Sequence, residues 1–237
     1  MANDYFRFKH FTIWQERTAM KVGTDGVLLG AWADTAGAKS VLDVGTGTGL
    51  IALMIAQRSE AEVTALEIEE EAFRQAKDNI LRTPWHERIF PLHLAFQDYY
   101  KKHQGRHDMI ITNPPYFKNS LESPTKARTL ARHSHALSYE DLLEGTQRLL
   151  EPQGKLSLIL PYEEGNKFLA TARQKGLYCT RRTSVYPRAH KKPARALMEF
   201  GFSQETTRED TLVIEKDQRH QFTEAYQALT RDFYLNF

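Results

Sequence analysis

The stretch Leu42-Asp-Val-Gly-Thr-Gly-Thr-Gly49 decides the fold class of this chain. It follows a short apolar run, Ser40–Val44, that is typical of a buried strand, and it precedes an apolar helical pattern at Leu50–Arg58. Glycines at this point permit a tight turn and let a ligand approach the backbone closely. Their spacing is G-x-G-x-G, which differs from the G-x-G-x-x-G of dinucleotide-binding proteins. The stretch therefore predicts a strand, a ligand-binding turn and a helix.

Strand and helix patterns alternate on the C-terminal side of this turn. Further strands are predicted at Glu62–Leu66, Ile89–Leu94, Met109–Thr112 and Lys155–Leu160, and helices at Glu69–Leu81, Ser138–Leu150 and Glu163–Lys175. Two consecutive late strands, Tyr178–Tyr186 and Arg195–Phe202, predict an antiparallel hairpin at one edge, and Arg219–Tyr234 predicts a closing helix. Such alternation is typical of an α/β fold with a mostly parallel sheet and helices on both faces. Ligands of such sheets bind at the carboxyl ends of the strands.

Length and composition favour one soluble domain. The chain has 237 residues, of which 41% are hydrophobic and 26% charged, with a net charge of +2. We expect a single domain over residues 1–237, in which residues 1–35 form an N-terminal strand and helix extension on the ligand side. No apolar run reaches the ~18 residues of a membrane span, and no signal peptide pattern opens the chain. The single cysteine, Cys179, excludes an intramolecular disulfide, and these features together predict a cytoplasmic protein.

Three carboxylates follow the first three strands of the alternating pattern. Asp43 precedes Gly45 by two residues, where it would repel a pyrophosphate and attract an ammonium group. Glu67 lies 22 residues after Gly45, close to the position of the acid that binds ribose hydroxyls in nucleotide folds. Asp98 follows the third strand, where it could accept a hydrogen bond from an adenine amino group. The set favours a nucleoside that carries an amino acid.

The fourth strand ends in Asn113-Pro-Pro-Tyr116. Two successive prolines fix the backbone and remove two N–H donors, which leaves carbonyl acceptors. The Asn113 side chain adds an acceptor, and Tyr116 adds an aromatic face. This array suits a planar ring that carries an amino nitrogen.

These elements resemble the class I S-adenosylmethionine-dependent methyltransferases, in the branch that carries N-P-P-Y and methylates amino groups. The resemblance implies a Rossmann-like, mostly parallel seven-stranded sheet and S-adenosylmethionine as cofactor, without a metal. It implies that Asn113, Pro114, Pro115 and Tyr116 are catalytic. Asn113 Oδ1 and the Pro114 carbonyl would accept the two amino hydrogens, and Tyr116 would stack on the target base. The implied cofactor-binding residues are Thr24, Asp43, Gly45, Thr46, Gly47, Gly49, Glu67, Ile68, Gln97 and Asp98.

The flanking sequences narrow the resemblance to bacterial tRNA (adenine-N6)-methyltransferases. Three stretches carry it: Phe6–Trp14, Lys21–Trp32 and Glu224–Leu235. The resemblance is strongest to the enzymes that methylate the adenosine 3′ to the anticodon, position 37, in valine tRNA. It implies a monomer that acts on the anticodon stem-loop.

Basic residues gather in two runs that follow the catalytic motif. A polyanion-binding face is one interpretation of such runs, and solvated surface charge is the other. The residues expected to bind RNA are Lys118, Lys126, Arg128, Arg132, Arg182, Arg188, Lys191 and Lys192. The chain has nine histidines, a residue type that often binds metals. His133 and His135 have no cysteine cluster beside them, however, and we expect no metal.

Three alternatives remain open. A protein glutamine-N5 methyltransferase shares N-P-P-Y, but such enzymes carry an N-terminal helical domain, and only about 20 residues precede Lys21 here. A ribosomal RNA guanine-N2 methyltransferase shares the N-P-P step but more often has Phe after it. A non-catalytic RNA-binding module with a relict cofactor pocket is disfavoured by the intact glycine turn, Glu67 and N-P-P-Y.

Overall fold

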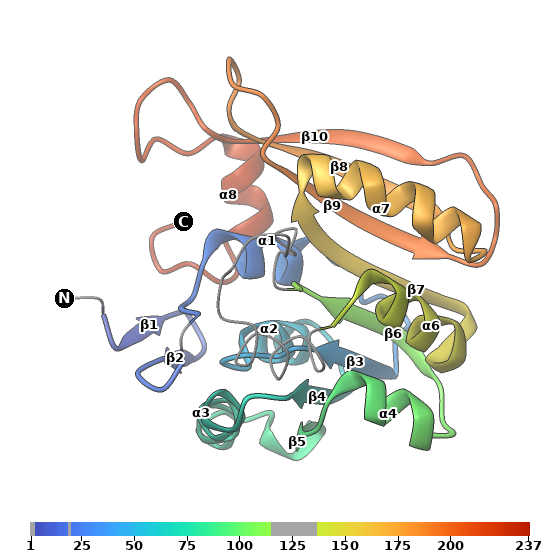
Figure 1. The fold of residues 1–237 in the computed structure, drawn as a ribbon. Coiled ribbons are helices and arrows are strands. Elements are labelled where there is room, and N and C mark those ends of the chain that lie inside the picture. The colour runs from blue at the N-terminus through green and yellow to red at the C-terminus, as the bar shows by residue number, and fades with distance from the viewer. Residues whose placement is uncertain (1–2, 19, 115–136) are drawn as a thin grey trace, which may run out of the picture.

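A computed structural model describes residues 3–18, 20–114 and 137–237 of the chain. Within these residues the fold is built on an eight-stranded sheet with the order β10-β8-β9-β7-β6-β3-β4-β5 (Figure 1). The strands are β3 (Ser40–Val44), β4 (Glu62–Glu67), β5 (Ile89–His93), β6 (His107–Thr112), β7 (Leu150–Pro161), β8 (Tyr178–Arg188), β9 (Arg195–Gly201) and β10 (Arg208–Glu215).

Strand directions bring many chain segments to one edge of the sheet. The strands β5, β4, β3, β6 and β7 run parallel to one another. β9 is antiparallel to its neighbours β7 and β8, and β10 runs parallel to β8. The carboxyl ends of β8 and β10 therefore lie at the same edge as the carboxyl ends of β3, β4 and β6.

The predicted α/β class, the mostly parallel sheet and the antiparallel pair β8–β9 are confirmed. The sheet has eight strands rather than the expected seven, so β10 and not the hairpin forms that edge. The sequence pattern misses β10 because only Leu212 of this strand is buried. A mostly exposed edge strand gives no run of apolar residues.

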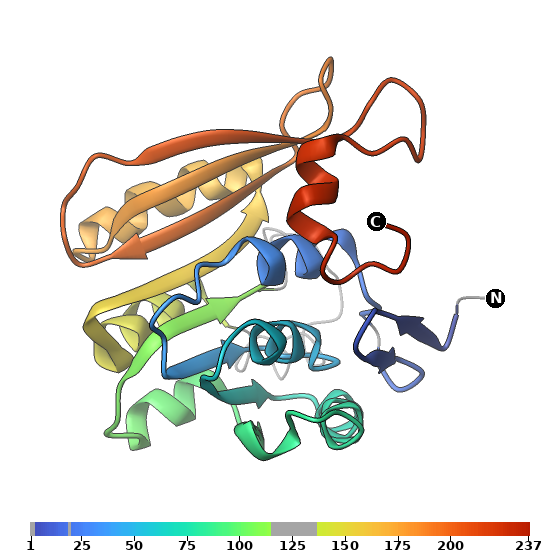
Figure 2. The same cartoon turned by 180° about the vertical axis from the view of Figure 1, so that it is seen from behind.

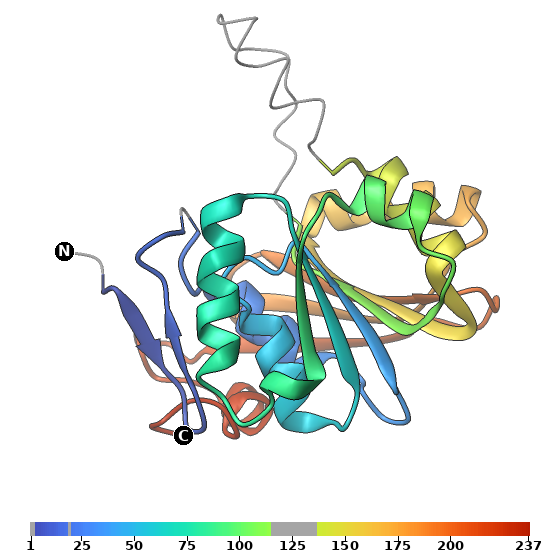
Figure 3. The same ribbon diagram turned by 90° about the horizontal axis from the view of Figure 1, so that it is seen from below.

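Helices cover both faces of the sheet, as Figure 3 shows from below. On one face lie α1 (Thr24–Trp32), α2 (Leu50–Arg58) and α3 (Glu70–Leu81), with α8 (Glu224–Thr230) packed against α1. On the other face lie α4 (Phe96–Lys102), α6 (Tyr139–Leu149) and α7 (Tyr162–Gln174). A short 3₁₀ turn, His86–Arg88, precedes β5.

The two faces bury separate hydrophobic clusters because side chains alternate along each strand. In β6, Met109 and Ile111 pack with α1 and α2, whereas Ile110 packs with α4 and α6. On the second face, α6 packs closely against α4 at Gly145. A Cβ on this residue would lie 2.3 Å from a ring carbon of Phe96. The close approach of α6 and α4 fixes the position of Phe96 at the start of α4.

The alternation of apolar and charged residues in Phe6–Trp14 predicts one N-terminal strand, but this segment is in fact a hairpin. β1 (Tyr5–Arg7) pairs antiparallel with β2 (Thr12–Trp14), because the chain turns between them and the Phe8 N–H donates to the Phe11 carbonyl. The predicted closing helix is also shorter, and only α8 within it is helical. Figure 2 shows the two termini on the same side of the molecule, and the Lys9 N–H donates to the Phe233 carbonyl.

Candidate functional site

Two cavities meet at the carboxyl ends of β3, β4 and β6. One, of about 600 Å³, is bordered by the start of α3 and is called here the α3 cavity. The other, of about 490 Å³, is bordered by the start of α1 and is called the α1 cavity. Gly45, Gly47, Asn113 and Met20 line both cavities. The glycine turn and the end of β6 therefore form the wall that the two cavities share.

The glycine turn adopts the conformation that its sequence predicts. Gly45 and Gly47 have φ angles of 73° and 58°, in the left-handed region that L side chains rarely adopt. A Cβ on either residue would meet no atom within 4 Å, so the space above the turn is open. The N–H groups of Gly45 and Thr46 both donate to the Leu66 carbonyl, which fixes the turn to the end of β4. A ligand can lie directly on this backbone.

The Glu67 carboxylate sits beside the turn at the end of β4. Its Oε2 accepts a hydrogen bond of 2.8 Å from the Gly47 N–H. Its Oε1 accepts hydrogen bonds of 2.9 Å from the N–H groups of Ile68 and Glu69. The side chain is 9% exposed and lines the α3 cavity. Oε1 already accepts two hydrogen bonds, whereas Oε2 accepts one and keeps acceptor capacity, so Glu67 can bind a hydroxyl group of a ligand in that cavity.

Asp43 lies beneath the turn and is fully buried. Its Oδ2 accepts a hydrogen bond of 2.6 Å from the Thr46 hydroxyl, while its Oδ1 has no hydrogen-bond partner among the described residues. Burial raises the pKa of Asp43 to about 7, because removal from water disfavours the charged carboxylate. A cation bound above the turn would favour its ionised form. Asp43 lines neither cavity, so its carboxylate lies beneath the turn and does not border the open space above it.

The remaining predicted cofactor residues take different positions. Ile68, 45% exposed, and Gln97 line the α3 cavity, whereas Thr24 and Thr46 line the α1 cavity. Gly49 begins α2 and lines neither cavity. Asp98 is exposed in the first turn of α4 and is likewise absent from both walls. Gln97 and not Asp98 is thus the polar side chain that α4 presents to the α3 cavity.

Asn113 and Pro114 follow directly after β6. The Thr112 hydroxyl donates a hydrogen bond of 2.8 Å to the Val44 carbonyl, which holds the end of β6 against the end of β3. Asn113 lines both cavities, and Pro114 lines the α1 cavity. The predicted catalytic residues Pro115 and Tyr116 lie outside the described residues, as do the basic residues Lys118, Lys126, Arg128 and Arg132.

An ion pair borders the α1 cavity. The Arg195 Nε, at the start of β9, donates a hydrogen bond of 2.8 Å to Asp25 Oδ2 in the first turn of α1. Both residues line the cavity together with Lys21 and Thr24. The pair joins the helix that follows the N-terminal hairpin to the distal half of the sheet. It therefore fixes one wall of the cavity.

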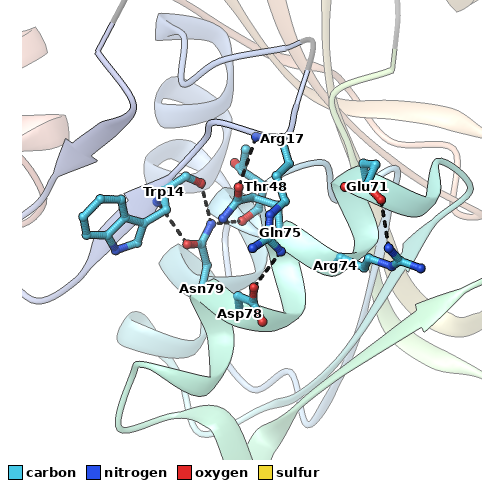
Figure 4. Close-up of polar contacts among 8 residues, drawn as sticks. All are labelled: Trp14, Arg17, Thr48, Glu71, Arg74, Gln75, Asp78 and Asn79. Carbon is cyan, nitrogen blue, oxygen red and sulfur yellow. Dashed lines mark hydrogen bonds and ion pairs between the residues drawn. The ribbon is translucent and has the colours of Figure 1, made fainter.

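The N-terminal segment is held over the α3 cavity by polar side chains of α3 that sequence analysis did not select (Figure 4). Asn79 is fully buried, and its Nδ2 donates to the carbonyls of Trp14 and Thr48 at 2.9 Å. Its Oδ1 accepts from the Trp14 N–H, and Gln75 Oε1 accepts from the Arg17 N–H. Arg17, whose guanidinium pairs with Asp78 at 2.9 Å, lines the α3 cavity with Thr18 and Met20. Asn79 thus ties the hairpin to the end of the glycine turn.

The described basic residues that we expected to bind RNA fall into two groups. Arg182 packs over the Tyr162 ring, 4.9 Å from its centroid, and Arg188 donates to Glu215 at 3.2 Å. Lys191 and Lys192 are exposed on the loop that joins β8 and β9. The two arginines have structural partners, whereas the two lysines face solvent.

Metal binding and thiol chemistry find no support in the described part of the chain. No group of three or more His, Cys, Asp or Glu side chains there is placed to hold a metal ion. Burial raises the pKa of the Cys179 thiol to about 11, which keeps it protonated. No helix among the described residues is long and apolar enough to cross a membrane.

Comparison with known proteins identifies the class of this fold and site. The family described as methyltransferase small domain matches residues 20–171, more than half of the chain. The chain therefore belongs to this family of methyltransferases. Solved structures agree on the fold: a predicted O-methyltransferase from Agrobacterium tumefaciens superposes with a TM-score of 0.65 at 21% identity, covering 88% of this chain and 96% of that one. The 16S rRNA N2 G1207 methyltransferase of T. thermophilus superposes with a TM-score of 0.58 at 18% identity, covering 84% of this chain and 50% of that one.

Relatives that match over the full length of the chain have more specific names. A protein of Bacteroides thetaiotaomicron is 45% identical over 238 residues, which cover 100% of this chain and 99% of the relative. A protein of Trichodesmium erythraeum is 44% identical over 240 residues, which cover 100% of both chains. Each relative is named tRNA1(Val) (adenine(37)-N6)-methyltransferase.

Proposed function

We propose that this protein transfers a methyl group from S-adenosylmethionine to the N6 amino group of an adenosine in tRNA, at position 37 of valine tRNA. The observation that carries the proposal is the position of Asn113, which borders both cavities at the end of β6. A residue on the shared wall can face a cofactor on one side and a target base on the other. The similarity to full-length relatives named for this reaction supports the substrate.

The residues of the shared wall fit the cofactor. Glu67 Oε2 offers an acceptor to a ribose hydroxyl in the α3 cavity, and the open backbone at Gly45 and Gly47 leaves room for the ligand. The Asp43 carboxylate lies beneath the turn and lines neither cavity, so in this proposal it favours the methionine ammonium through its charge and not by direct contact. When bound, S-adenosylmethionine supplies a methyl group on a sulfonium that needs no further activation. We assign Ile68, Gln97 and Thr46 to the same site.

In the proposed reaction the protein must position and activate a weak nucleophile, the adenine N6 amino group. The lone pair of the adenine N6 is delocalised into the ring, so a planar amino group attacks poorly. Asn113 Oδ1 and the Pro114 carbonyl, as acceptors for the two N6 hydrogens, would favour a pyramidal nitrogen whose lone pair can point at the methyl group. Acceptors held in place before the reaction contribute through positioning and electrostatics. Pro115 stiffens the motif and Tyr116 stacks on the base in this proposal.

The tRNA would approach across the edge of the sheet that carries Asn113. We propose that the anticodon stem-loop is the part that binds and that the protein acts as a cytoplasmic monomer. A base at position 37 lies in a loop, where turning it out of its stack costs less than in a duplex. Among the described basic residues, Lys191 and Lys192 are the ones we assign to phosphate contacts, because Arg182 and Arg188 already have protein partners.

The proposal is tested by methyl transfer from labelled S-adenosylmethionine to total tRNA from a strain that lacks this protein. Nucleosides are then identified by mass spectrometry, with Asn113→Ala as the active-site variant and Asn166→Ala, an exposed asparagine of α7, as the matched control. We expect N6-methyladenosine with the wild type and with Asn166→Ala. With Asn113→Ala we expect a rate lower by about 10²- to 10³-fold and unchanged cofactor affinity. Label in ribosomal RNA or in a release factor instead of tRNA would overturn the substrate.

A further inference from the structure

A third pocket, of about 630 Å³, lies beside the α1 cavity and is called here the aromatic pocket. It is formed by the N-terminal hairpin, the end of β10, the loop that follows β10 and the last residues of the chain. Aromatic rings form much of its wall: Phe6, Phe222, Tyr226, Tyr234 and Phe237. The reaction proposed above assigns no role to it.

The rings of this pocket hold one another in place. Phe222 stacks on Tyr226 with centroids 5.2 Å apart, and Phe237 meets Tyr234 edge to face at 5.3 Å. The Tyr226 hydroxyl lies 3.4 Å from the Tyr234 hydroxyl, and burial raises the pKa of Tyr226, so its phenol stays neutral. Phe6, Phe222, Tyr234 and Phe237 nevertheless remain partly exposed. A planar ligand can therefore meet ring surface that is already ordered.

The aromatic pocket lies next to the proposed reaction site. Thr24, at the start of α1, lines both the aromatic pocket and the α1 cavity that contains Asn113 and Pro114. Strand direction places the pocket at the same edge of the sheet, because β8 and β10 both end there. A strand of RNA whose target base enters the α1 cavity can place another nucleotide in the aromatic pocket.

The loops that follow β8 and β10, whose ends line this pocket, carry the charge that a phosphate backbone needs. The loop after β8 contains Lys191 and Lys192, and the loop after β10 contains Lys216 and Arg219 against one acid, Asp217. Within the described residues, no ion pair engages any of these four basic side chains.

Glu215 joins the two basic loops. Its Oε2 accepts from the Arg188 guanidinium at the end of β8, and its Oε1 accepts a hydrogen bond of 2.9 Å from the His220 N–H. His220 has a φ of 66°, in the left-handed region, so the loop is bent sharply where it borders the pocket. The carboxylate thus fixes both loops on one side of the ring wall.

We propose that the aromatic pocket binds an unpaired nucleobase of the same RNA, next to the target adenosine, while the two basic loops contact its phosphates. The inference rests on the function proposed above and adds to it a second base-binding subsite. Bases stack on aromatic side chains with little sequence preference, and basic side chains beside such rings follow the backbone. The pocket therefore contributes to affinity for the loop and to the register in which the target base reaches Asn113.

The test uses the whole protein and anticodon stem-loop RNAs in which each nucleotide that flanks the target is replaced in turn by an abasic residue. KM and kcat of methyl transfer are measured for the wild type, for Phe222→Leu and for Phe202→Leu. Phe202 is a partly exposed phenylalanine just after β9, at the opposite edge of the sheet, and serves as the matched control. Affinity for S-adenosylhomocysteine verifies that each variant is folded.

We expect one abasic position to raise KM of the wild type by about tenfold, with kcat nearly unchanged, which is the loss expected for one stacked base. Phe222→Leu should raise KM for the intact RNA by a similar factor and should then be insensitive to that abasic position. Phe202→Leu should behave as the wild type. An unchanged KM with Phe222→Leu would overturn the inference. So would a variant in which the abasic position raises KM by the same factor as in the wild type.

A second measurement needs no variant. Stem-loops carry 2-aminopurine at each flanking position, and its fluorescence should be quenched at one of them when the wild type binds, because the base stacks on the rings. Quenching at none of them overturns the inference while normal methylation leaves the proposed function intact. A wild type that methylates no tRNA overturns both. A dimer in sedimentation that Phe222→Leu dissociates would assign the pocket to a second copy of the chain instead.

Discussion

The Gly47 N–H donates a hydrogen bond of 2.8 Å to the carboxylate of Glu67, which joins the glycine turn after β3 to the end of β4. Because Glu67 also accepts from the N–H groups of Ile68 and Glu69, one carboxylate fixes the backbone of two neighbouring strand ends. The same side chain lines the α3 cavity. Glu67 thus contributes both to the shape of the proposed cofactor site and to its chemistry.

Glu67→Gln should weaken cofactor binding. An amide replaces one of the two acceptor oxygens with a donor, so it must face at least one N–H that now lacks an acceptor. A hydrogen bond to a charged group contributes about 1.5–3 kcal/mol, so we expect affinity for S-adenosylhomocysteine to fall by roughly 10- to 100-fold in calorimetric titration. Glu71→Gln is the control, since Glu71 lines the same cavity but is half exposed in an ion pair with Arg74. Equal losses in both variants would contradict this role of Glu67.

Asn79→Ala should destabilise the fold far more than the neighbouring Asp78→Ala. The buried Asn79 amide bonds the backbone of both Trp14 and Thr48, and its loss leaves several buried polar groups without partners. We expect a loss of about 2–4 kcal/mol in the free energy of unfolding, measured by urea denaturation. Asp78→Ala removes only an exposed ion pair with Arg17, worth roughly 0.2–1 kcal/mol. Similar values for the two variants would disprove the structural role of Asn79.

Gly145→Ala should disturb the α3 cavity by displacing Phe96, which forms part of the cavity wall. A Cβ at Gly145 would lie 2.3 Å from Phe96 and 2.7 Å from Tyr100, and Phe96 lines the cavity. Overpacking of this kind costs about 1–3 kcal/mol, and we expect a lower melting temperature together with weaker cofactor binding. Gly201→Ala is the control, because the nearest atom to its Cβ would be 3.7 Å away. A Gly145→Ala protein with wild-type stability would show that α4 and α6 can separate at no cost.

The polar residues of α3 show what sequence analysis could and could not find. The positions of Asp43, Glu67 and Asn113 follow from strand ends alone, because parallel strands bring their carboxyl ends to one edge. Gln75 and Asn79 lie on the buried stripe of α3 with Ala72, Ala76 and Ile80. Polar residues at helical spacing within an apolar stripe indicate buried hydrogen bonds. Their partners could not be predicted, because they belong to a hairpin whose sequence pattern is that of one continuous strand.

The aromatic pocket lay beyond sequence analysis for a different reason. It joins Phe6 with residues 222–237, and a contact between the two ends of a chain leaves no local pattern. Its position beside the α1 cavity depends on β10, an edge strand whose weak apolar pattern went unrecognised. The roles of Arg182 and Arg188 could not be predicted either. A run of basic residues does not reveal which members contact other protein groups.

Asp43→Asn should change how stability depends on pH. Burial raises the pKa of Asp43 to about 7 in the folded protein, above the ~3.9 of an unfolded chain, so folding takes up a proton between these values. The neutral carboxyl therefore favours folding at low pH, and this contribution is lost as pH rises from about 4 to 7. A shift of this size corresponds to a few kcal/mol. The asparagine variant cannot titrate, so we expect it to be equal to the wild type near pH 4 and more stable near pH 8.

His107 contributes with the opposite sign and must be separated from Asp43. It lies between the Ser40 and Tyr99 hydroxyls, and burial lowers its pKa to about 4. Since this value lies below the ~6.5 of an unfolded histidine, its contribution is present above pH 6.5 and is lost as pH falls toward 4. Urea denaturation between pH 4 and pH 8 of the wild type, Asp43→Asn, His107→Gln and the double variant resolves the two. Parallel pH profiles for the wild type and Asp43→Asn would mean that Asp43 is ionised in the folded protein, with a partner that compensates its burial.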